Sequence, residues 1–407
     1  MRCPSGRLDS SSPGGTVASS SDFFQHRSPQ AVLKHGLLAR YAHYFAGRAG
    51  AATGGRVAFI DGYAGEGRYA DGNPGSPLLL ATQANQARLF GRDVKLALVE
   101  QDPIRRAQLK RSLSESGLSP DQLIGDDLGD VVDQLLERYS DRAILLFLDP
   151  FGLAFDRTTL ERVLDLSSRG HPIDVIYHFS LSTVARMGRA GVVSNAAAPK
   201  NAFLLERALG NIRWRIEFKR AVEPNSATEV ALMVARRFGD AVSRGVGFRC
   251  TSIPVVQRPT QLPKYLLMLF SRNEQAHWDF ADQASIAYVE WLHHCDSEDY
   301  RANVQRREEY GLQEMFPEPE PSRDDIDRRI TEEAARYLPE HLSSLLRQRS
   351  GVRLIDAIED AYGDLLGRAR VTHLRAALRN LYRSGQIGDD SKGDYWTRSI
   401  HWIGPID

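Results

Sequence analysis

Carboxylate side chains stand directly after three apolar segments of this chain. Asp61 follows the run VAFI, Glu100 follows LALV, and Asp149 follows ILLFL. Because ligands bind beyond the carboxyl ends of the strands in an open α/β sheet, we expect these side chains to line one site. Two more acids, Asp126 and Asp127, come shortly after a further apolar segment. The spacing predicts a site rich in hydrogen-bond acceptors, suited to a ligand with hydroxyl groups and positive charge.

The turn that follows Asp61 is rich in glycine. Its sequence, GYAGEG, spans residues 62–67. Glycine permits positive φ angles and lets a ligand approach the backbone closely, which is why nucleotide sites use it. We therefore predict four ligand contacts in this turn: Gly62, Ala64, Gly65 and Gly67.

The pattern of this turn disfavours two phosphate ligands. Arg68 and Tyr69 follow Gly67, so the turn is not the G-x-x-x-x-G-K-[ST] motif of nucleoside triphosphate sites. It also lacks G-x-G-x-x-G, which disfavours a dinucleotide. The acid Asp61 would repel phosphate and attract an ammonium or sulfonium group. S-adenosylmethionine carries both groups, and we predict it as the cofactor.

The acids after the next two segments suit the nucleoside part of such a cofactor. Glu100 can accept two hydrogen bonds from the vicinal hydroxyls of a ribose. Asp126 or Asp127 can accept from an adenine amino group. An acid at a strand end is also a common N-cap of the following helix, and this alternative stays open for each of these residues.

The fourth segment ends in the turn DPFG, predicted as the catalytic centre: Asp149, Pro150, Phe151 and Gly152. Asp149 and the Pro150 carbonyl can accept hydrogen bonds from an exocyclic amine while Phe151 stacks on its ring. Methyl transfer to that amine is an in-line displacement, so catalysis is mostly positioning, desolvation and removal of one proton. The alternative is a βα turn with a helix cap.

Further polar residues follow the fifth segment. His178 and Ser180 come at its end, on the same predicted rim, and Arg186 and Arg189 come after them. A lone histidine at a strand end is more often a satisfied core group than a base, so we do not assign His178 a catalytic role.

The elements that must position these side chains alternate between strands and helices. An amphipathic helix is predicted over 31–47, and Ser76 is the expected N-cap of a helix with Pro77 at its first position. Two late strands, including 265–272, suit an antiparallel hairpin at a sheet edge, and a helix over 278–293 follows. The predicted fold is α/β, a Rossmann-like, doubly wound, mostly parallel sheet. Its strands are expected at 57–60, 96–99, 122–124, 144–148 and 174–179.

Five motifs in order resemble a known family. FIDGYAGEG, GSPLLLA, LVEQD, LFLDPFG and VIYHFS are similar to the three-Cys-motif partner (TcmP) family, and the resemblance covers roughly residues 30–294. The pair Lys34-His35 is similar to the amino-terminal signature of that family. The resemblance implies a bacterial protein with the class I methyltransferase type of fold, and a separate partner protein with a CxxxCxxC-type cluster. DPFG also resembles the strand-four motif of tRNA guanine-N2 methyltransferases, and departs from the D-P-P-[YFW] of adenine-N6 enzymes.

The C-terminal part reads as a separate, small α+β unit. A Pro- and Glu-rich linker precedes it at 315–325, and its segment THLRAALRNLYRSGQIG predicts a helix with a leucine stripe and an adjacent basic face. The following GDDSKGDYW and SIHWI predict a β hairpin, which together suggest a winged helix. Residues 368–398 carry seven basic and three acidic residues. A protein-binding winged helix is the alternative to our prediction that four residues bind nucleic acid: Arg375, Arg379, Tyr382 and Arg383.

Composition sets the outer limits. The chain has 407 residues, a formal net charge of zero and 42% hydrophobic residues, which fits two globular domains. Its three cysteines are far apart and lack metal-ligand spacing, so we expect no metal and no disulfide framework. No signal peptide or membrane span is evident, and we expect a cytoplasmic protein. The predicted division is a disordered tail (1–22), a methyltransferase-like domain (23–295), a helix end and linker (296–325) and the C-terminal unit (326–407).

The sequence therefore predicts a methyltransferase that uses S-adenosylmethionine to modify an amino nitrogen of a nucleic acid, RNA rather than DNA. A non-catalytic, methyltransferase-like scaffold that binds a partner protein and nucleic acid is the alternative. An accessory protein of a nuclease or mobile element is a third reading, for which the sequence offers no metal cluster.

Overall fold

The computed structural model describes residues 29–150, 156–166, 172–192, 198–210, 213–220, 226–310, 319–349 and 351–404. The predicted tail lies outside these ranges. So do Phe151 and Gly152, two of the four residues of the predicted catalytic turn.

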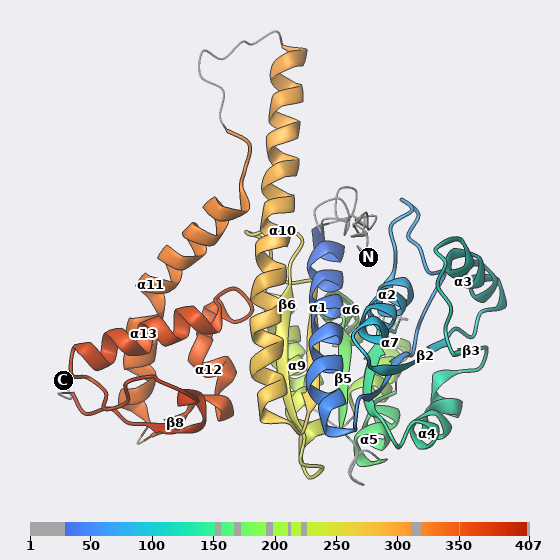
Figure 1. Cartoon of the computed structure of the whole chain (residues 1–407), viewed down its shortest axis with the longest axis horizontal. Coiled ribbons are helices and arrows are strands. Elements are labelled where there is room, and N and C mark those ends of the chain that lie inside the picture. The colour runs from blue at the N-terminus through green and yellow to red at the C-terminus, as the bar shows by residue number, and fades with distance from the viewer. Residues whose placement is uncertain are drawn as a thin grey trace, which may run out of the picture.

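A single large sheet organises the N-terminal part (Figure 1). Among the described residues it has seven strands in the order β3-β2-β1-β4-β5-β7-β6. The first five are parallel to one another, whereas β7 is antiparallel to both β5 and β6. The prediction of a Rossmann-like, mostly parallel sheet with an antiparallel edge hairpin is confirmed. The strands are β1 (Arg56–Asp61), β2 (Asp93–Val99), β3 (Gln122–Ile124), β4 (Ala143–Leu148), β5 (Ile173–Phe179), β6 (Arg249–Val255) and β7 (Tyr265–Ser271).

Helices cover both faces of this sheet, which explains why its central strands are continuous apolar runs. Along β1, Val57 and Phe59 join one core cluster while Ala58 and Ile60 join the other. One face is covered by α1 (Pro29–Ala52), α2 (Ser76–Leu89), α3 (Pro103–Glu115) and α10 (Glu274–Glu309). The other is covered by α4 (Leu128–Arg138), α5 (Arg157–Leu166), α6 (Leu181–Val192), α7 (Ala198–Leu209), α8 (Trp214–Arg220) and α9 (Ser226–Ser243).

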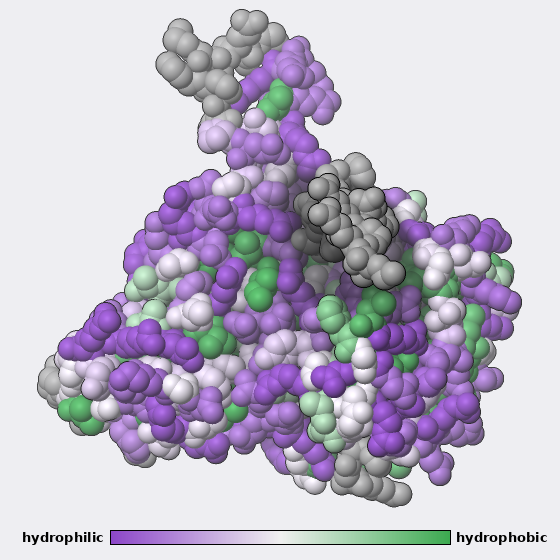
Figure 2. Space-filling model, viewed as in Figure 1, coloured by the Kyte–Doolittle hydropathy of each residue, from purple (hydrophilic) through white to green (hydrophobic). Residues whose placement is uncertain are grey.

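Two helix boundaries differ from the sequence prediction. The N-cap of α2 is Gly75 rather than Ser76, and no side chain caps this helix. Ser76 is instead the first helical residue, and its hydroxyl interacts with Asp61. The helix predicted over 278–293 is α10, which has 36 residues and projects beyond the rest of the molecule (Figure 1). Figure 2 shows that the projecting end is mainly hydrophilic. Because it lacks an apolar face, an amphipathic pattern in the sequence does not reveal that the helix continues there.

The C-terminal part packs against α10. It contains α11 (Arg323–Gln348), β8 (Val352–Arg353), α12 (Ile358–Tyr362), α13 (Val371–Arg383) and β9 (Ser399–Ile400). β8 pairs with β9, and Ile387 forms a bridge with Trp402. The predicted pairing of a strand at Tyr395–Trp396 with the final segment is wrong, because Tyr395–Thr397 is a 3-10 helix.

A helix that spans a membrane needs about 20 consecutive, mainly apolar residues. Within the part of the chain that the structure describes, no helix is both long and apolar enough to cross a bilayer.

Candidate functional site

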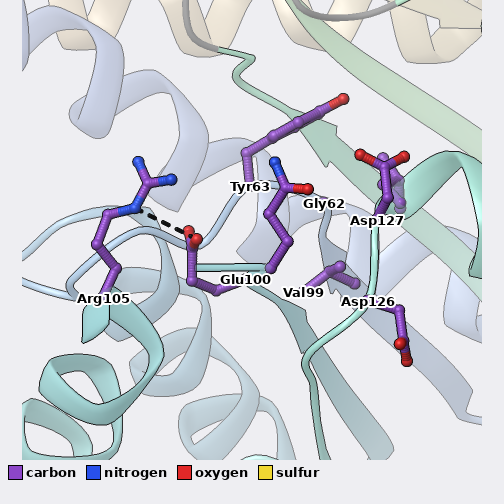
Figure 3. A pocket seen from close by; sticks show the side chains of 9 residues that line it. Gly62, Tyr63, Val99, Glu100, Arg105, Asp126 and Asp127 are labelled. Carbon is purple, nitrogen blue, oxygen red and sulfur yellow. Dashed lines mark ion pairs between the residues drawn. The ribbon is translucent and has the colours of Figure 1, made fainter. Parts of the chain in front are cut away.

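A cavity of about 230 Å³ lies beyond the carboxyl ends of β1, β2 and β3 (Figure 3). Three predicted site residues from three different strand ends line it: Gly62, Glu100 and Asp126. Asp127 lines it as well. The parallel sheet therefore brings together acids that lie far apart in the sequence, as predicted.

Glu100 is buried and holds the glycine-rich turn in place. Its Oε2 accepts a hydrogen bond from the Gly65 N–H at 2.9 Å, and its Oε1 accepts from the Asp102 N–H at 2.9 Å. Arg105 Nε lies 3.3 Å from the same carboxylate (Figure 3). A carboxylate has about four acceptor positions, so Glu100 keeps acceptor capacity toward the cavity after these contacts.

The two acids after β3 have different roles. Asp127 is the N-cap of α4, where its Oδ1 accepts from the Gly129 N–H at 2.8 Å. The helix-cap alternative is thus the observed role of Asp127, although the residue also lines the cavity. In Figure 3 the Asp126 carboxylate points away from Tyr63 and Glu100. Of the two, Asp127 is the better placed to contact a ligand near Tyr63.

The turn after β1 needs its glycines for steric reasons. Gly65 and Gly67 have φ angles of 63° and 86°. A Cβ on Gly62 would lie 2.6 Å from Leu128, which leaves no room for a side chain. The Gly62 N–H donates to the Phe147 carbonyl at 2.9 Å, and the Ala64 N–H to Val99 at 2.9 Å. These bonds fix the turn against β4 and β2.

Asp61 is fully buried at the start of this turn. The Tyr63 N–H donates to its Oδ1 at 3.1 Å, whereas Oδ2 is buried without a hydrogen-bond partner in the described part of the chain. Burial raises the pKa of Asp61 to about 7, against the opposing effect of the Ser76 hydroxyl and the Tyr63 N–H. A buried acceptor without a donor costs free energy, and a cationic ligand would remove that cost.

A second cavity, of about 710 Å³, adjoins the first and shares Tyr63 and Arg105 with it. It runs past the glycine-rich turn to the end of β4, where Asp149 and Pro150 line it. The predicted cofactor and catalytic residues that the structure describes thus line two adjoining cavities, except Asp61, which is fully buried beneath the turn and lines neither.

Asp149 pairs with two side chains at the end of β4. The Lys34 ammonium donates a hydrogen bond to its Oδ2. His178 Nδ1 lies 3.3 Å from its Oδ1, without the alignment of a hydrogen bond. Burial alone would raise the pKa of Asp149, but Lys34 and His178 hold it below its usual value. Asp149 is therefore an anion already compensated by a buried cation.

The pKa values of the two partners of Asp149 shift in opposite directions. Burial favours neutral Lys34, but Asp149 together with Tyr69 and Asp61 outweighs this effect and raises the pKa of Lys34 above its usual value. Burial lowers the pKa of His178 to about 4, against the opposing effect of Asp149. At neutral pH the site holds an ammonium, a carboxylate and a neutral imidazole.

Sequence reasoning missed several residues of these cavities, four of which have side chains of functional interest. Tyr63, Arg105 and Lys34 were not selected, and His178 was set aside as a core group, yet all four line a cavity. A signal for Lys34 existed, because it interrupts the apolar stripe of α1 together with His35, which contacts the Tyr69 hydroxyl at 3.1 Å.

The predicted nucleic-acid residues of α13 fall into two groups. Arg379, Tyr382 and Arg383 are exposed, and neither arginine has an ion pair among the described residues. Arg375 instead lies with its guanidinium 5.0 Å from the centre of the Tyr395 ring and donates a hydrogen bond to that hydroxyl. Arg375 thus has a structural contact that sequence reasoning did not foresee.

A protein metal site needs several ligating side chains close together. Within the described ranges, no group of three or more His, Cys, Asp or Glu side chains is arranged to hold a metal ion.

Comparison with known proteins gives a loose structural likeness only. No family model matches the chain, and no curated protein matches it. The plantazolicin methyltransferase BamL, solved with a substrate analogue and SAH, is 9% identical with a TM-score of 0.34, over 60% of this chain and 86% of its own. The plantazolicin methyltransferase BpumL with the same kind of analogue and SAH is 13% identical with a TM-score of 0.30, over 62% and 89%.

A third solved structure is the methyltransferase domain of bacterial CtHen1. It is 13% identical with a TM-score of 0.31, over 59% of this chain and 99% of its own. Each of these scores lies below 0.5, so the likeness carries no argument about activity. The strand order of this chain is what identifies its N-terminal part as a Rossmann-like α/β sheet.

Proposed function

We propose that this chain is an S-adenosylmethionine-dependent methyltransferase that acts on an amino nitrogen of a nucleic acid, RNA rather than DNA. The observation that carries the proposal is the pair of acids at neighbouring strand ends. Asp61 has a buried oxygen without a hydrogen-bond partner among the described residues, just beneath the turn, and Glu100 keeps acceptor capacity toward the cavity that it lines. This arrangement suits one ligand that has a cationic end and a ribose end.

The residues present fit such a cofactor. Asp61 would hold its cationic amino-acid part, the backbone of Gly62, Ala64, Gly65 and Gly67 would lie against it, and Glu100 would accept from the ribose hydroxyls. The cofactor supplies a methyl group on a sulfonium, which needs no further activation by the protein. The contribution of the chain is therefore to bind, to orient and to exclude water.

We assign proton removal from the acceptor amine to His178. Lys34 already compensates Asp149, which makes this carboxylate a poor proton acceptor. The imidazole of His178 lines the same cavity and is neutral at pH 7; burial lowers its pKa to about 4, so its acceptance of a proton depends on the nearby Asp149 carboxylate. As the methyl group passed from the sulfonium to the amine, with the sulfur–carbon bond breaking and SAH leaving, the amine proton would pass to the imidazole, and the Asp149 carboxylate 3.3 Å away would stabilise the imidazolium.

The nucleic-acid part of the proposal rests on the C-terminal unit. The order α11, β8, α12, α13, β9 and the Ile387–Trp402 bridge support a winged helix, with α13 as its third helix. Arg379 and Arg383 on α13 would contact phosphates, and Tyr382 would lie beside them.

The partner protein and the cellular location are proposals that rest on the sequence resemblance alone. We propose a bacterial, cytoplasmic member of the TcmP group that acts with a three-Cys-motif protein. Co-purification of the two from the native cell tests this point directly.

Tritium transfer from labelled cofactor to total RNA and total DNA, taken from cells that lack the protein, tests the activity. We expect incorporation into RNA, and an approximately 100-fold loss or more in His178→Asn with unchanged cofactor affinity. Asp149→Asn should also lose transfer, and it is preferable to Ala because it keeps a polar partner for Lys34. Equal incorporation by the wild type and both variants would overturn the assignment of this centre.

One observation favours the scaffold alternative. Because Lys34 occupies the Asp149 carboxylate, an acceptor amine cannot use that oxygen without displacing it. A chain that binds cofactor but transfers no methyl group to any nucleic-acid fraction would establish the scaffold function.

A further inference from the structure

A groove of about 600 Å³ lies between α6 and α9, on the face of the sheet opposite α1. Its described lining comes from Ser182, Ala185, Arg186, Arg189 and Ala190 of α6 and from Ala227 and Thr228 of α9. This lining contains two cations and no acid. The nearest acid in the sequence, Glu229, is exposed in the first turn of α9 and is not part of the described lining.

The two arginines of the groove are available to a ligand. Arg186 and Arg189 are exposed, and neither has a hydrogen bond or an ion pair with a described residue. Their spacing of three residues places them on the same face of α6. Arginines on neighbouring helices differ, because Arg157 pairs with Glu161, Arg215 with Glu206 and Arg237 with Glu217.

The groove starts at the rim of the candidate site. α6 follows β5 after Ser180, and β5 carries His178, which lines the central cavity. The Ser182 N–H donates to the Lys264 carbonyl at 3.0 Å, which places the start of α6 beside the start of β7. At 1.5 Å per residue, Arg186 and Arg189 lie about 9 and 13.5 Å along the helix axis from Ser180.

A third cation lies at this junction. Lys264 is exposed, and its ammonium donates to the amide oxygen of Gln257 rather than to a carboxylate. Lys264 is not part of the described lining of the groove, but its backbone lies beside the first turn of α6, and like Arg186 and Arg189 it has no ion pair with a described acid.

We propose that Arg186, Arg189 and Lys264 form a binding groove for the phosphate backbone of a single-stranded nucleic acid whose target base enters the central cavity. The proposal rests on the proposed function and extends it to the path of the substrate. Enzymes that modify a base take it from a single strand or out of the duplex. Cationic side chains close to the cavity mouth would then bind the phosphates on either side of that base. Arginine suits this role because it binds phosphate with two parallel hydrogen bonds.

Fluorescence anisotropy with an end-labelled, mixed-sequence RNA of 20 nucleotides tests the groove, with the full chain and a titration of salt. Arg186→Gln/Arg189→Gln should weaken binding by about tenfold or more and lower the slope of log K against log salt by about 1.4, since each phosphate contact on a single strand contributes about 0.7. The matched control is Lys110→Gln/Arg111→Gln, which removes two exposed cations of α3 and should leave both quantities unchanged.

Two further measurements keep this test separate from the proposed function. SAH affinity by calorimetry should be equal in the wild type, the groove variant and the control, which also verifies that each is folded. If the groove variant bound RNA with the same affinity and salt slope as the wild type, the groove proposal would be overturned, even if SAH binds. Competition by poly-glutamate as strong as that by RNA would overturn the nucleic-acid assignment in favour of an acidic protein. Loss of SAH binding in the wild type would refute the cofactor site and leave the groove to be decided by the RNA measurement.

Discussion

Asp61 is the residue whose protonation the proposed ligand changes most. Its carboxyl group is fully buried with one oxygen lacking a donor, and burial raises its pKa to about 7. A cationic ligand stabilises the ionised form, so the pKa of Asp61 must fall on binding. Binding therefore releases a proton wherever the free group is still protonated.

This linkage gives a pH prediction. The free site is about one-tenth ionised at pH 6 and nine-tenths ionised at pH 8, so SAH affinity should be roughly tenfold weaker at pH 6. Asp61→Asn should weaken binding at pH 8 and remove the dependence between these two values. Calorimetry at both pH values measures this affinity. The control variant is Asp141→Asn, a change at an exposed residue. A wild-type affinity that is equal at pH 6 and pH 8 would exclude Asp61 as the cation-binding group.

At the scale of elements, the strand ends and the glycine-rich turn were predictable because both follow from local rules. A run such as ILLFL must be buried on two faces, and the acid after it then lies at the sheet rim. The contributions of α1 were not predictable in this way. Lys34 meets Asp149 only because α1 crosses the sheet beside β4, a contact between residues 115 positions apart in sequence.

The length of α10 and the role of Arg375 escaped prediction for the same reason. The projecting end of α10 has no apolar face for periodicity to detect, and Arg375 depends on where a later 3-10 helix places Tyr395. The boundaries of the predicted domains stay a prediction, although α11 begins at Arg323, inside the predicted linker.

The exposed cations of α13 give a prediction for this element. Arg379→Gln/Arg383→Gln should reduce affinity for unrelated RNA sequences alike and lower the salt slope by about 1.4. Arg375→Gln should instead lower the thermal midpoint, because it removes the contact with Tyr395. Anisotropy and thermal unfolding separate the two effects. An unchanged salt slope in the double variant would assign this unit to a protein partner.

At the scale of the molecule, the C-terminal part closes the open edge of the sheet. The Ser252 N–H of the edge strand β6 donates to Glu359 of α12 at 2.8 Å. Arg249 of the same strand donates to the Ile355 carbonyl at 3.2 Å. Trp396 stacks on Trp278 of α10 with ring centres 5.8 Å apart. Unpaired edge strands favour aggregation, and these contacts cover this one.

This interface predicts that the two parts unfold together. Glu359→Ala leaves the Ser252 N–H without an acceptor and should cost about 1 to 3 kcal/mol in the free energy of unfolding. Urea denaturation should show a single transition at a lower midpoint. Glu340→Ala, an exposed change on α11, is the control and should be neutral. A Glu359 variant as stable as the control would mean that this contact does not hold the two parts together.

The most direct test of the central claim is calorimetric titration of the whole chain with SAH. We predict one site with micromolar affinity, about −8 kcal/mol, weakened by about 1.5 to 3 kcal/mol in Glu100→Gln. The absence of any binding heat from a folded wild-type chain at saturating SAH would contradict the account, because neither Asp61 nor Glu100 would then belong to a cofactor site.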